Sequence, residues 1–325
     1  MRKILLLLVL VLVLTTISYV RAEPRKILVV ATIPPLAAIA EEVGGERVEV
    51  AYLVPGTSDP HQYAPTLRDI NLVMACDLFI EVGKEPFLNS LPEKRGKVKL
   101  SWNNWTNAGL LIRDGNPHYI WLYLENVKKV ARLVAKALAK LDPEHSEFYL
   151  ARANKFAAKI ENLEKWIRAY VRAHGVGEET VALIGSHFIP LVESIGLKFM
   201  GPLLESEGQT PTPKDLNEFI RRIEESGTKL IVVLATQRDA DEGRIARSIA
   251  SEKGISIVYL HGIQFHGSDD YFEYIKYTVA SLVAGIESAR SGTSEEKSEW
   301  STTTIILATI ALLEAILLLK WRVLK

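Results

Sequence analysis

The chain has 325 residues, with 39 basic and 39 acidic side chains and a single cysteine. A formal net charge of zero offers no basic surface to a polyanion, so we expect no nucleic acid partner. One thiol cannot form an internal disulfide, and the apolar run that contains Cys76 indicates a buried core position.

The N-terminus has the pattern of a secretory signal. Arg2 and Lys3 precede an unbroken apolar run over residues 4–14, and the following segment ends in Val20-Arg21-Ala22. A small-x-small pattern of this kind is typical of a signal-peptide cleavage site. We therefore predict a signal peptide at residues 1–22 and a mature body outside the cytoplasm.

The C-terminus has the pattern of a membrane anchor. Residues 305–319 are apolar except for Glu314, Trp300 and Trp321 bracket them, and a basic cluster follows. From one tryptophan to the other, a helix would span about 30 Å, enough to cross a bilayer. We predict a linker at residues 290–302 and a transmembrane helix at residues 303–320. The basic cluster predicts a single-pass cell-membrane protein whose body lies on the extracellular side and whose terminal helix contacts lipid.

Between these ends, strand and helix patterns alternate in two series. The first has strands at residues 26–32, 48–53 and 77–82, with helices at 35–43 and 66–75. The second has strands at 180–184, 229–234 and 255–260, with helices at 213–225 and 241–253. This alternation predicts parallel sheets flanked by helices. The fold class is α/β with two lobes, at residues 23–141 and 176–289.

One long helix is predicted between the lobes, at residues 142–175. Asp142 can cap it, with Pro143 at the first helical position and Gly175 as the stop. Apolar residues recur on one face at spacings of four and three: Phe156, Ile160, Leu163, Ile167 and Tyr170. A helix of about 48 Å is longer than one small lobe, so we expect a rigid spine that joins both.

Four histidines each follow a short apolar run in a context rich in Pro, Gly or Ser: His61, His118, His187 and His261. Ligands of open α/β sheets collect at the carboxyl ends of strands. Imidazoles contributed by distant loops are a common way to build a transition-metal site. Since two histidines come from each side of the spine, we predict a metal site in the cleft between the lobes.

Several motifs resemble the zinc and manganese solute-binding proteins of ABC importers, the ZnuA/TroA-like cluster A-I family. The matching stretches are residues 30–36, 43–45, 53–56 and 59–66, Asn116-Pro117-His118 with Trp121-Leu122, Gly185-Ser186-His187 with residues 195–197, and residues 211–216. The resemblance covers roughly residues 26–288. It implies two α/β lobes on a rigid helical spine and an inter-lobe metal held by four side chains.

The sequence offers several candidates for the fourth ligand and for the metal. His261 stands where the family most often has an aspartate, and His266 is its rival; Asp59, Asp269 and Glu205 are further candidate oxygen donors or supporting acceptors. An all-imidazole set favours Zn²⁺, with Mn²⁺ or Fe²⁺ as alternatives. Because bound imidazoles must be neutral, metal affinity should weaken below about pH 6.5.

Together these features predict an extracytoplasmic solute-binding protein, not an enzyme, that captures zinc and delivers it to an ABC permease with its cytoplasmic ATPase. No Gly-rich phosphate loop is present, so the chain is not the ATPase itself. Two alternatives are a binder of a metal chelate and a membrane-anchored zinc hydrolase. The second is disfavoured because no His-Glu-x-x-His motif occurs.

Overall fold

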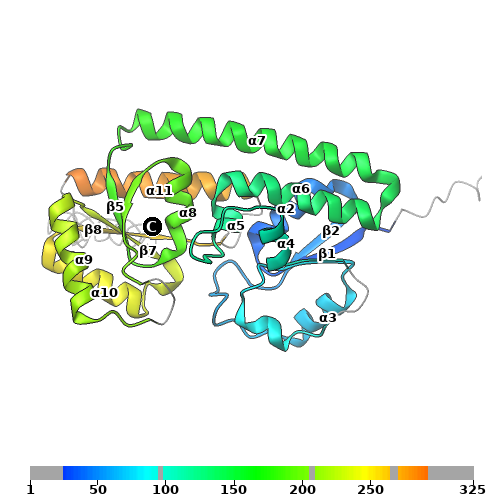
Figure 1. The fold of residues 1–325 in the computed structure, drawn as a ribbon, viewed down its shortest axis with the longest axis horizontal. Coiled ribbons are helices and arrows are strands. Elements are labelled where there is room, and N and C mark those ends of the chain that lie inside the picture. Colours follow the sequence, from blue (N-terminus) through cyan, green and yellow to red (C-terminus); the bar gives the residue numbers. More distant parts are fainter. Residues whose placement is uncertain (1–24, 94–97, 205–208, 264–269, 292–325) are drawn as a thin grey trace, which may run out of the picture.

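Two parallel sheets of four strands each form the body of the molecule (Figure 1). The computed structural model describes residues 25–93, 98–204, 209–263 and 270–291. In each sheet the first strand in sequence lies between the second and the third, so the strand order reverses there, which gives each lobe the doubly wound arrangement predicted from the alternation of strands and helices. The predicted α/β class with two lobes is confirmed.

The N-terminal sheet has the strand order β2-β1-β3-β4. Its strands are β1 (Ile27–Ala31), β2 (Val48–Tyr52), β3 (Leu78–Ile80) and β4 (Val98–Leu100). Helices α2 (Pro34–Gly44), α3 (Leu67–Ala75) and α4 (Trp102–Asn107) accompany them. The sequence pattern did not predict β4, because an edge strand of three residues with a central Lys99 has no distinct apolar signal.

The C-terminal sheet has the equivalent order β6-β5-β7-β8. Its strands are β5 (Thr180–Leu183), β6 (Lys198–Met200), β7 (Leu230–Leu234) and β8 (Ser256–Leu260). The short helical turns η4 (Ser186–Phe188) and η5 (Ala235–Gln237) follow β5 and β7, and the helices are α8 (Ile189–Ile195), α9 (Pro213–Ser226) and α10 (Asp241–Lys253). All five residues of β7 are buried, as expected for a central strand covered on both faces.

The predicted spine is present as α7 (Ser146–Ala173), which runs along both lobes (Figure 1). Its 28 residues span about 42 Å at 1.5 Å per residue. The predicted start was wrong: residues 143–145 form a separate 3-10 turn, η3, and the α-helix begins only at Ser146. The carboxylate of Asp142 does not cap the helix but accepts a hydrogen bond from the hydroxyl of Tyr149, at 2.7 Å.

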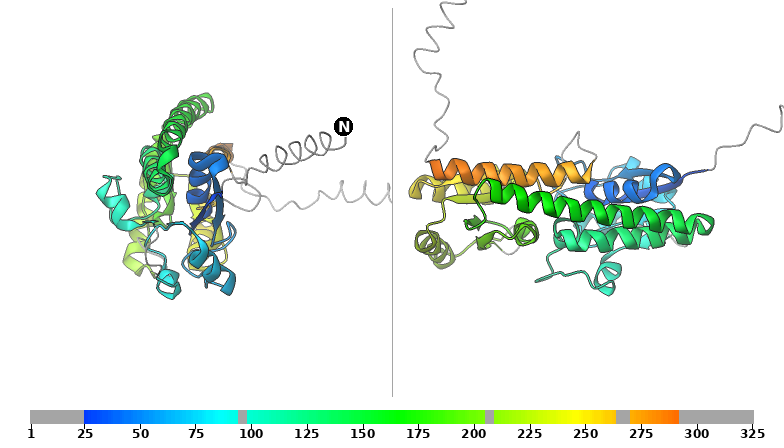
Figure 2. Two further views of the ribbon diagram at one scale, coloured as in Figure 1. Left: turned by 90° about the vertical axis from the view of Figure 1, so that its right-hand side faces the viewer. Right: turned by 90° about the horizontal axis from the view of Figure 1, so that it is seen from above.

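Two further long helices, which the sequence analysis did not single out, pack along α7. They are α6 (Leu124–Leu141) and α11 (Tyr271–Ser291), and Figure 2 shows α11 beside α7. One hydrophobic cluster includes buried residues of both lobes and of all three helices. The ring centroids of Phe156 in α7 and Phe272 in α11, for example, are 5.2 Å apart. The lobes therefore share a continuous core, which is a stiffer connection than a single helix.

The predicted ends of the chain fall outside the described residues. This applies to the signal peptide at residues 1–22, to the transmembrane helix at residues 303–320, and to the linker at 290–302 except for its first two residues, which belong to α11. Within the ranges that the structure describes, no helix combines the length and the apolar character that a membrane crossing needs.

Shortening Phe156 to alanine tests the shared core. Phe156 is 1% exposed, and the Phe156→Ala variant loses its contacts with two aromatic rings of α11. We expect a loss of about 3–5 kcal/mol in the free energy of unfolding, measured by urea denaturation followed by circular dichroism. The neighbouring exposed Lys155 supplies the control, because Lys155→Ala should change stability by less than about 0.5 kcal/mol. A loss below about 1 kcal/mol for Phe156→Ala would contradict a core that joins the lobes.

Candidate metal-binding cleft

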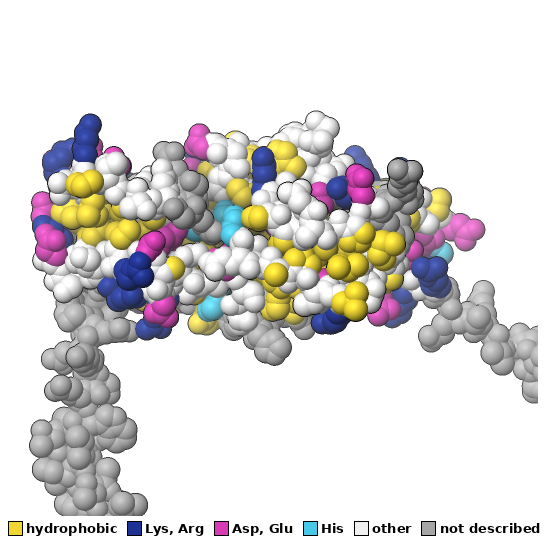
Figure 3. All heavy atoms as spheres, turned by 90° about the horizontal axis from the view of Figure 1, so that it is seen from below, with side chains coloured by type: hydrophobic (Ala, Val, Ile, Leu, Met, Phe, Trp, Pro, Cys, Tyr) yellow, Lys and Arg dark blue, Asp and Glu magenta, His cyan; other side chains and the backbone are white. Residues whose placement is uncertain are grey.

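A pocket lies between the two lobes, and all four predicted histidines line it. Figure 3 shows histidine side chains at the surface between the two halves. The pocket wall also contains residues at the ends of β1, β3 and β7 or just after them: Ile33, Val82, Lys84, Glu85, Leu234 and Thr236. The strand order reverses between β1 and β3 in the N-terminal sheet and between β5 and β7 in the C-terminal sheet, and ligands of open α/β sheets bind at such points.

His118 is held in one orientation by a neighbouring amide. It immediately precedes the short helix α5 (Tyr119–Leu122). The side-chain oxygen of Asn116 lies 3.0 Å from the backbone nitrogen of His118 and 2.8 Å from its ring Nδ1. An amide oxygen only accepts hydrogen bonds, so Nδ1 carries the proton and Nε2 keeps its lone pair. His118 is thereby prepared to bind a cation through Nε2.

His187 approaches His118 from the other lobe. It lies in η4, directly after β5, and is 4% exposed. The two imidazole rings have centroids 4.7 Å apart at an angle of 75°. The amide nitrogen of Asn116 also donates a hydrogen bond to the backbone oxygen of Ser186, at 2.8 Å. Asn116 therefore orients one histidine and ties its loop to the turn that carries the other.

His61 lies on an exposed loop between β2 and α3, and Asp59 fixes that loop. One carboxylate oxygen of Asp59 accepts a hydrogen bond from the backbone nitrogen of His61, at 2.9 Å. The other accepts hydrogen bonds from the side chains of Gln62, at 3.1 Å, and Gln237, at 3.0 Å. Gln237 is a buried residue of the C-terminal lobe. The loop of His61 is thus anchored across the cleft.

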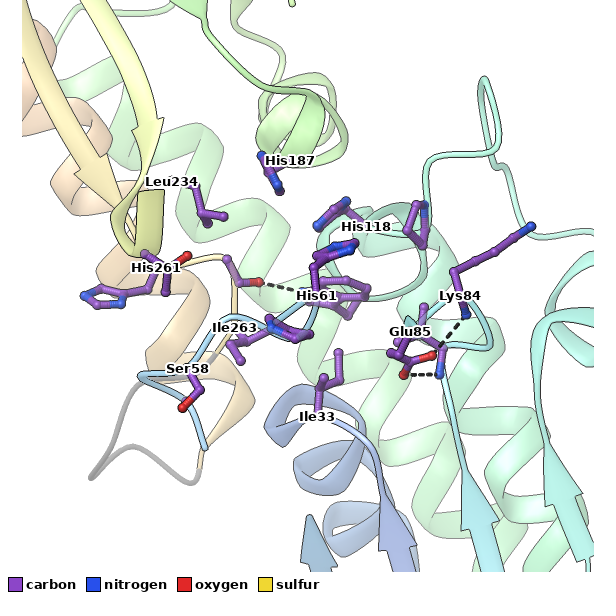
Figure 4. A pocket seen from close by; sticks show the side chains of 17 residues that line it. Ile33, Ser58, His61, Lys84, Glu85, His118, His187, Leu234, His261 and Ile263 are labelled. Carbon is purple, nitrogen blue, oxygen red and sulfur yellow. Dashed lines mark hydrogen bonds between the residues drawn. The ribbon is translucent and has the colours of Figure 1, made fainter. Parts of the chain in front are cut away.

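His261 lies on the far wall of the pocket. In Figure 4 the rings of His61, His118 and His187 are turned toward a common space, whereas the ring of His261 points away from it. Among the described residues, no three or more His, Cys, Asp or Glu side chains are arranged so that they could hold a metal ion as they stand. The structure therefore brings three predicted histidines close together and leaves His261 apart.

Of the other candidates for the fourth position, the structure describes only Asp59. His266, Asp269 and Glu205 lie outside the described residues. Asp59 uses its carboxylate for the hydrogen bonds that fix the His61 loop, so its observed role is to support a histidine. The identity of the fourth ligand remains a prediction.

Burial favours the neutral form of two of the imidazoles, those of His118 and His261. Burial lowers the pKa of His118 well below its usual value, and the nearby His187 and His61 lower it further. His118 as a whole is half-buried, and its ring contacts the rings of Trp121 and His187. Burial also lowers the pKa of His261. Neutral rings are the form that coordinates a metal, so a cation meets little competition from protons at His118 near neutral pH.

The sequence analysis missed the residues that support these histidines. Asn116 and Gln237 act through contacts described above, and Glu85 holds the loop after β3. The buried carboxylate of Glu85 accepts hydrogen bonds from the backbone nitrogens of residues 82–84, at 2.7–3.0 Å. For Asn116 a signal existed, since it stands two residues before a candidate ligand. For Gln237 no signal existed, because its partner is far away in sequence.

Comparison with known proteins gives one family. The family model described as "Zinc-uptake complex component A periplasmic", ZnuA, matches residues 29–285. The manganese-binding lipoprotein MntA of Halalkalibacterium halodurans is 24% identical over 267 residues, covering 79% of this chain and 88% of that protein. The high-affinity zinc uptake system protein ZnuA of Bacillus subtilis is 22% identical over 262 residues, covering 74% of this chain and 79% of that protein.

Solved structures share the fold. A crystal structure of ZnuA superposes with a TM-score of 0.66 at 23% identity, covering 80% of this chain and 99% of that one. The periplasmic zinc-binding protein TroA of Treponema pallidum gives a TM-score of 0.66 at 17% identity, covering 81% and 99%. FpvC of Pseudomonas aeruginosa, solved with Mn²⁺, gives 0.67 at 21% identity, covering 82% and 100%.

The lowered pKa of His118 predicts how the metal-free protein responds to acid. Between the folded pKa and the unfolded value of about 6.5, the unfolded chain takes up a proton that the folded chain does not. The free energy of unfolding should therefore fall as the pH drops below about 6.5, by up to about 1.4 kcal/mol per pH unit for this group. Urea denaturation of the metal-free protein between about pH 7.5 and 5.5 measures the slope. The His118→Asn variant should have a shallower slope, and an unchanged slope would contradict a neutral, enclosed His118.

Proposed function

This chain belongs to the ZnuA family of periplasmic zinc-uptake components, and on that premise we propose that it captures a divalent transition metal in the cleft between its lobes. The observation that carries the proposal is the approach of His61, His118 and His187 from both lobes to one space. Two of these rings come from the N-terminal lobe and one from the C-terminal lobe. A cation bound by all three would link the lobes directly.

We infer that the metal is zinc. Neutral imidazole nitrogen is a favourable ligand for Zn²⁺, with bonds of about 2.0–2.1 Å, whereas Mn²⁺ selection usually involves carboxylate oxygens. Two carboxylates at the cleft, those of Asp59 and Glu85, are engaged by hydrogen bonds. Mn²⁺ and Fe²⁺ remain the alternatives, since relatives of this chain are named for zinc and for manganese.

We further propose that the protein delivers its metal to an ABC permease driven by a cytoplasmic ATPase. The relatives include manganese ABC transporter substrate-binding lipoproteins, such as PsaA of Streptococcus mitis. In this proposal residues 1–22 direct export, and a helix at residues 303–320 anchors the body to the outer face of the cell membrane. Anchoring raises the effective concentration of the protein at the permease entrance. The protein acts by binding and release and carries out no chemical step.

Removing either of two histidines tests the site. His61→Ala and His187→Ala should each weaken zinc binding by more than about 100-fold, beyond the range seen for outer-shell substitutions, because each removes a direct ligand from one lobe. Competition with a chromophoric chelator measures the affinity. His174→Ala is the matched control, since His174 ends α7 and contacts Glu287 outside the cleft. If either histidine of the cleft can be lost without effect, a zinc ion shared by the two lobes is excluded.

Native mass spectrometry of the protein purified without chelators separates the proposal from its alternatives. One retained bare metal ion supports metal capture. A retained organic molecule of larger mass would instead support binding of a metal chelate.

The role of His261 needs its own measurement. His261→Ala should weaken zinc binding by about 10-fold or more if its ring turns to join the other three, and by little if it remains on the wall. Extended X-ray absorption of the zinc-loaded protein then counts the imidazole ligands. Four in the wild type and three in the variant would support the predicted ligand set, and three in both would refute it.

A further inference from the structure

We propose that Glu242 is a positioning residue that holds the ring of His187 with its Nε2 atom facing the cleft. The inference rests on the proposed function, in which His187 binds the metal. Glu242 lies in the first turn of α10 and is 4% exposed, so its carboxylate sits inside the C-terminal lobe. The metal-site motifs of the sequence do not include it.

The geometry around Gly185 places this carboxylate beside His187. A β-carbon built on Gly185 would lie 2.7 Å from Nδ1 of His187 and 3.1 Å from Oε2 of Glu242. Both atoms therefore lie against the same α-carbon, in the space that a side chain would occupy. Gly185 has φ −107° and ψ 167°, an extended conformation that any residue adopts. Glycine is needed here for space and not for backbone freedom.

The chemistry of the pair determines which ring nitrogen is available. A neutral imidazole has one N–H group, and an ionised carboxylate only accepts hydrogen bonds. A carboxylate that accepts from Nδ1 keeps the proton on Nδ1 and leaves the lone pair on Nε2. A ligating histidine commonly donates its second ring N–H to a carboxylate, which fixes the tautomer and orients the ring. Nδ1 of His187 faces Gly185, so Nε2 is directed to the other side of the ring.

The arrangement mirrors that of His118. Asn116 accepts from Nδ1 of His118, and this leaves Nε2 for the metal. The rings of His118 and His187 are adjacent, with centroids 4.7 Å apart. Glu242 supplies on the C-terminal side what Asn116 supplies on the N-terminal side. Two neighbouring ligands thereby present the same nitrogen from opposite walls.

Stabilisation of the α10 N-terminus does not explain the burial of Glu242. A carboxylate in the first helical turn interacts favourably with the helix dipole from the surface, without losing its hydration. Asp241 already occupies that turn, with a side chain that is 64% exposed and pairs with Arg244. A second carboxylate inside the protein is costly unless a partner needs it. The adjacent imidazole is such a partner.

The direct test is the tautomer of His187 in the metal-free protein, read from the nitrogen-15 shifts of its ring. We expect the Nδ1–H form in the wild type and a mixture of tautomers in Glu242→Leu. Zinc affinity should fall by about 10- to 100-fold in Glu242→Leu, the range for loss of an outer-shell partner. Glu242→Gln, whose amide oxygen can still accept from Nδ1, should retain the tautomer and lose less affinity.

A second variant approaches the pair from the opposite side. Gly185→Ala inserts a methyl group between the ring and the carboxylate, so it should produce the same tautomer mixture while leaving Glu242 in place. Gly177→Ala is the matched control, because its nearest atom would be Cγ1 of Val171 at an ordinary 3.6 Å. If Glu242→Leu fails to fold, the tautomer of His187 and the zinc affinity measured in Gly185→Ala still test the proposal.

The proposal is overturned if His187 keeps the Nδ1–H tautomer in both Glu242→Leu and Gly185→Ala. It is also overturned if zinc affinity stays within about twofold of the wild type in those variants. Failure of the proposed function is distinguishable, because it appears as unchanged zinc binding in His187→Ala. The tautomer of the metal-free protein does not depend on that result.

Discussion

The site depends on the core that the two lobes share. Metal coordination by imidazoles from two lobes requires their relative position to be held to a fraction of an ångström, which separately moving lobes would not provide. Trp121 illustrates how close the connection is. Its indole nitrogen donates to the backbone oxygen of Gly262 at 2.8 Å, and its own backbone oxygen accepts from the hydroxyl of Tyr271 at 2.7 Å. A residue adjacent to His118 is thereby fixed to the segment that follows His261.

Around this frame, the histidines are oriented by acceptors and donors contributed by neighbouring loops. The connection between β7 and α10 is notable because it reaches two of them. Gln237 within it binds the carboxylate that fixes the His61 loop, and Glu242, in the first turn of α10 that it leads into, lies close to His187. A displacement of this one connection would shift two of the predicted ligands, His61 and His187, which come from different lobes.

The elements with strong local signals were predictable from the sequence. The start of α3 follows from the reciprocal capping of Thr66 and Asp69, and Thr212 and Asp215 set the start of α9 in the same way. The strands β4 and β6 were missed because three residues with one lysine each carry no pattern. The helix α6 was missed although its apolar residues recur at helical spacing, because the predicted spine was restricted to a single helix.

The residues of the candidate site likewise fall into those with a local sequence signal and those without one. A histidine after a strand is visible in the sequence, because strand ends meet at one edge of a parallel sheet. Asn116 could be suspected, because it stands two residues before His118, but the roles of Gln237 and Glu242 arise from contacts that only the folded chain creates. The side chain of Asn116 donates to the backbone oxygen of Ser186, which is 70 positions away, and that of Gln237 donates to Asp59, which is 178 positions away. No periodicity or spacing encodes such a pair.

His261 shows how the frame limits what the cleft can do. Its backbone oxygen accepts from the hydroxyl of Tyr274 at 3.1 Å, and the next residue, Gly262, is bound to Trp121. With the main chain held at both positions, a fourth imidazole contact requires rotation of the side chain and not a movement of the strand end. Side-chain rotation is fast and local compared with a domain movement. In a protein whose lobes share a core, the simplest way to complete or to open a coordination shell is to turn one ring on a fixed backbone.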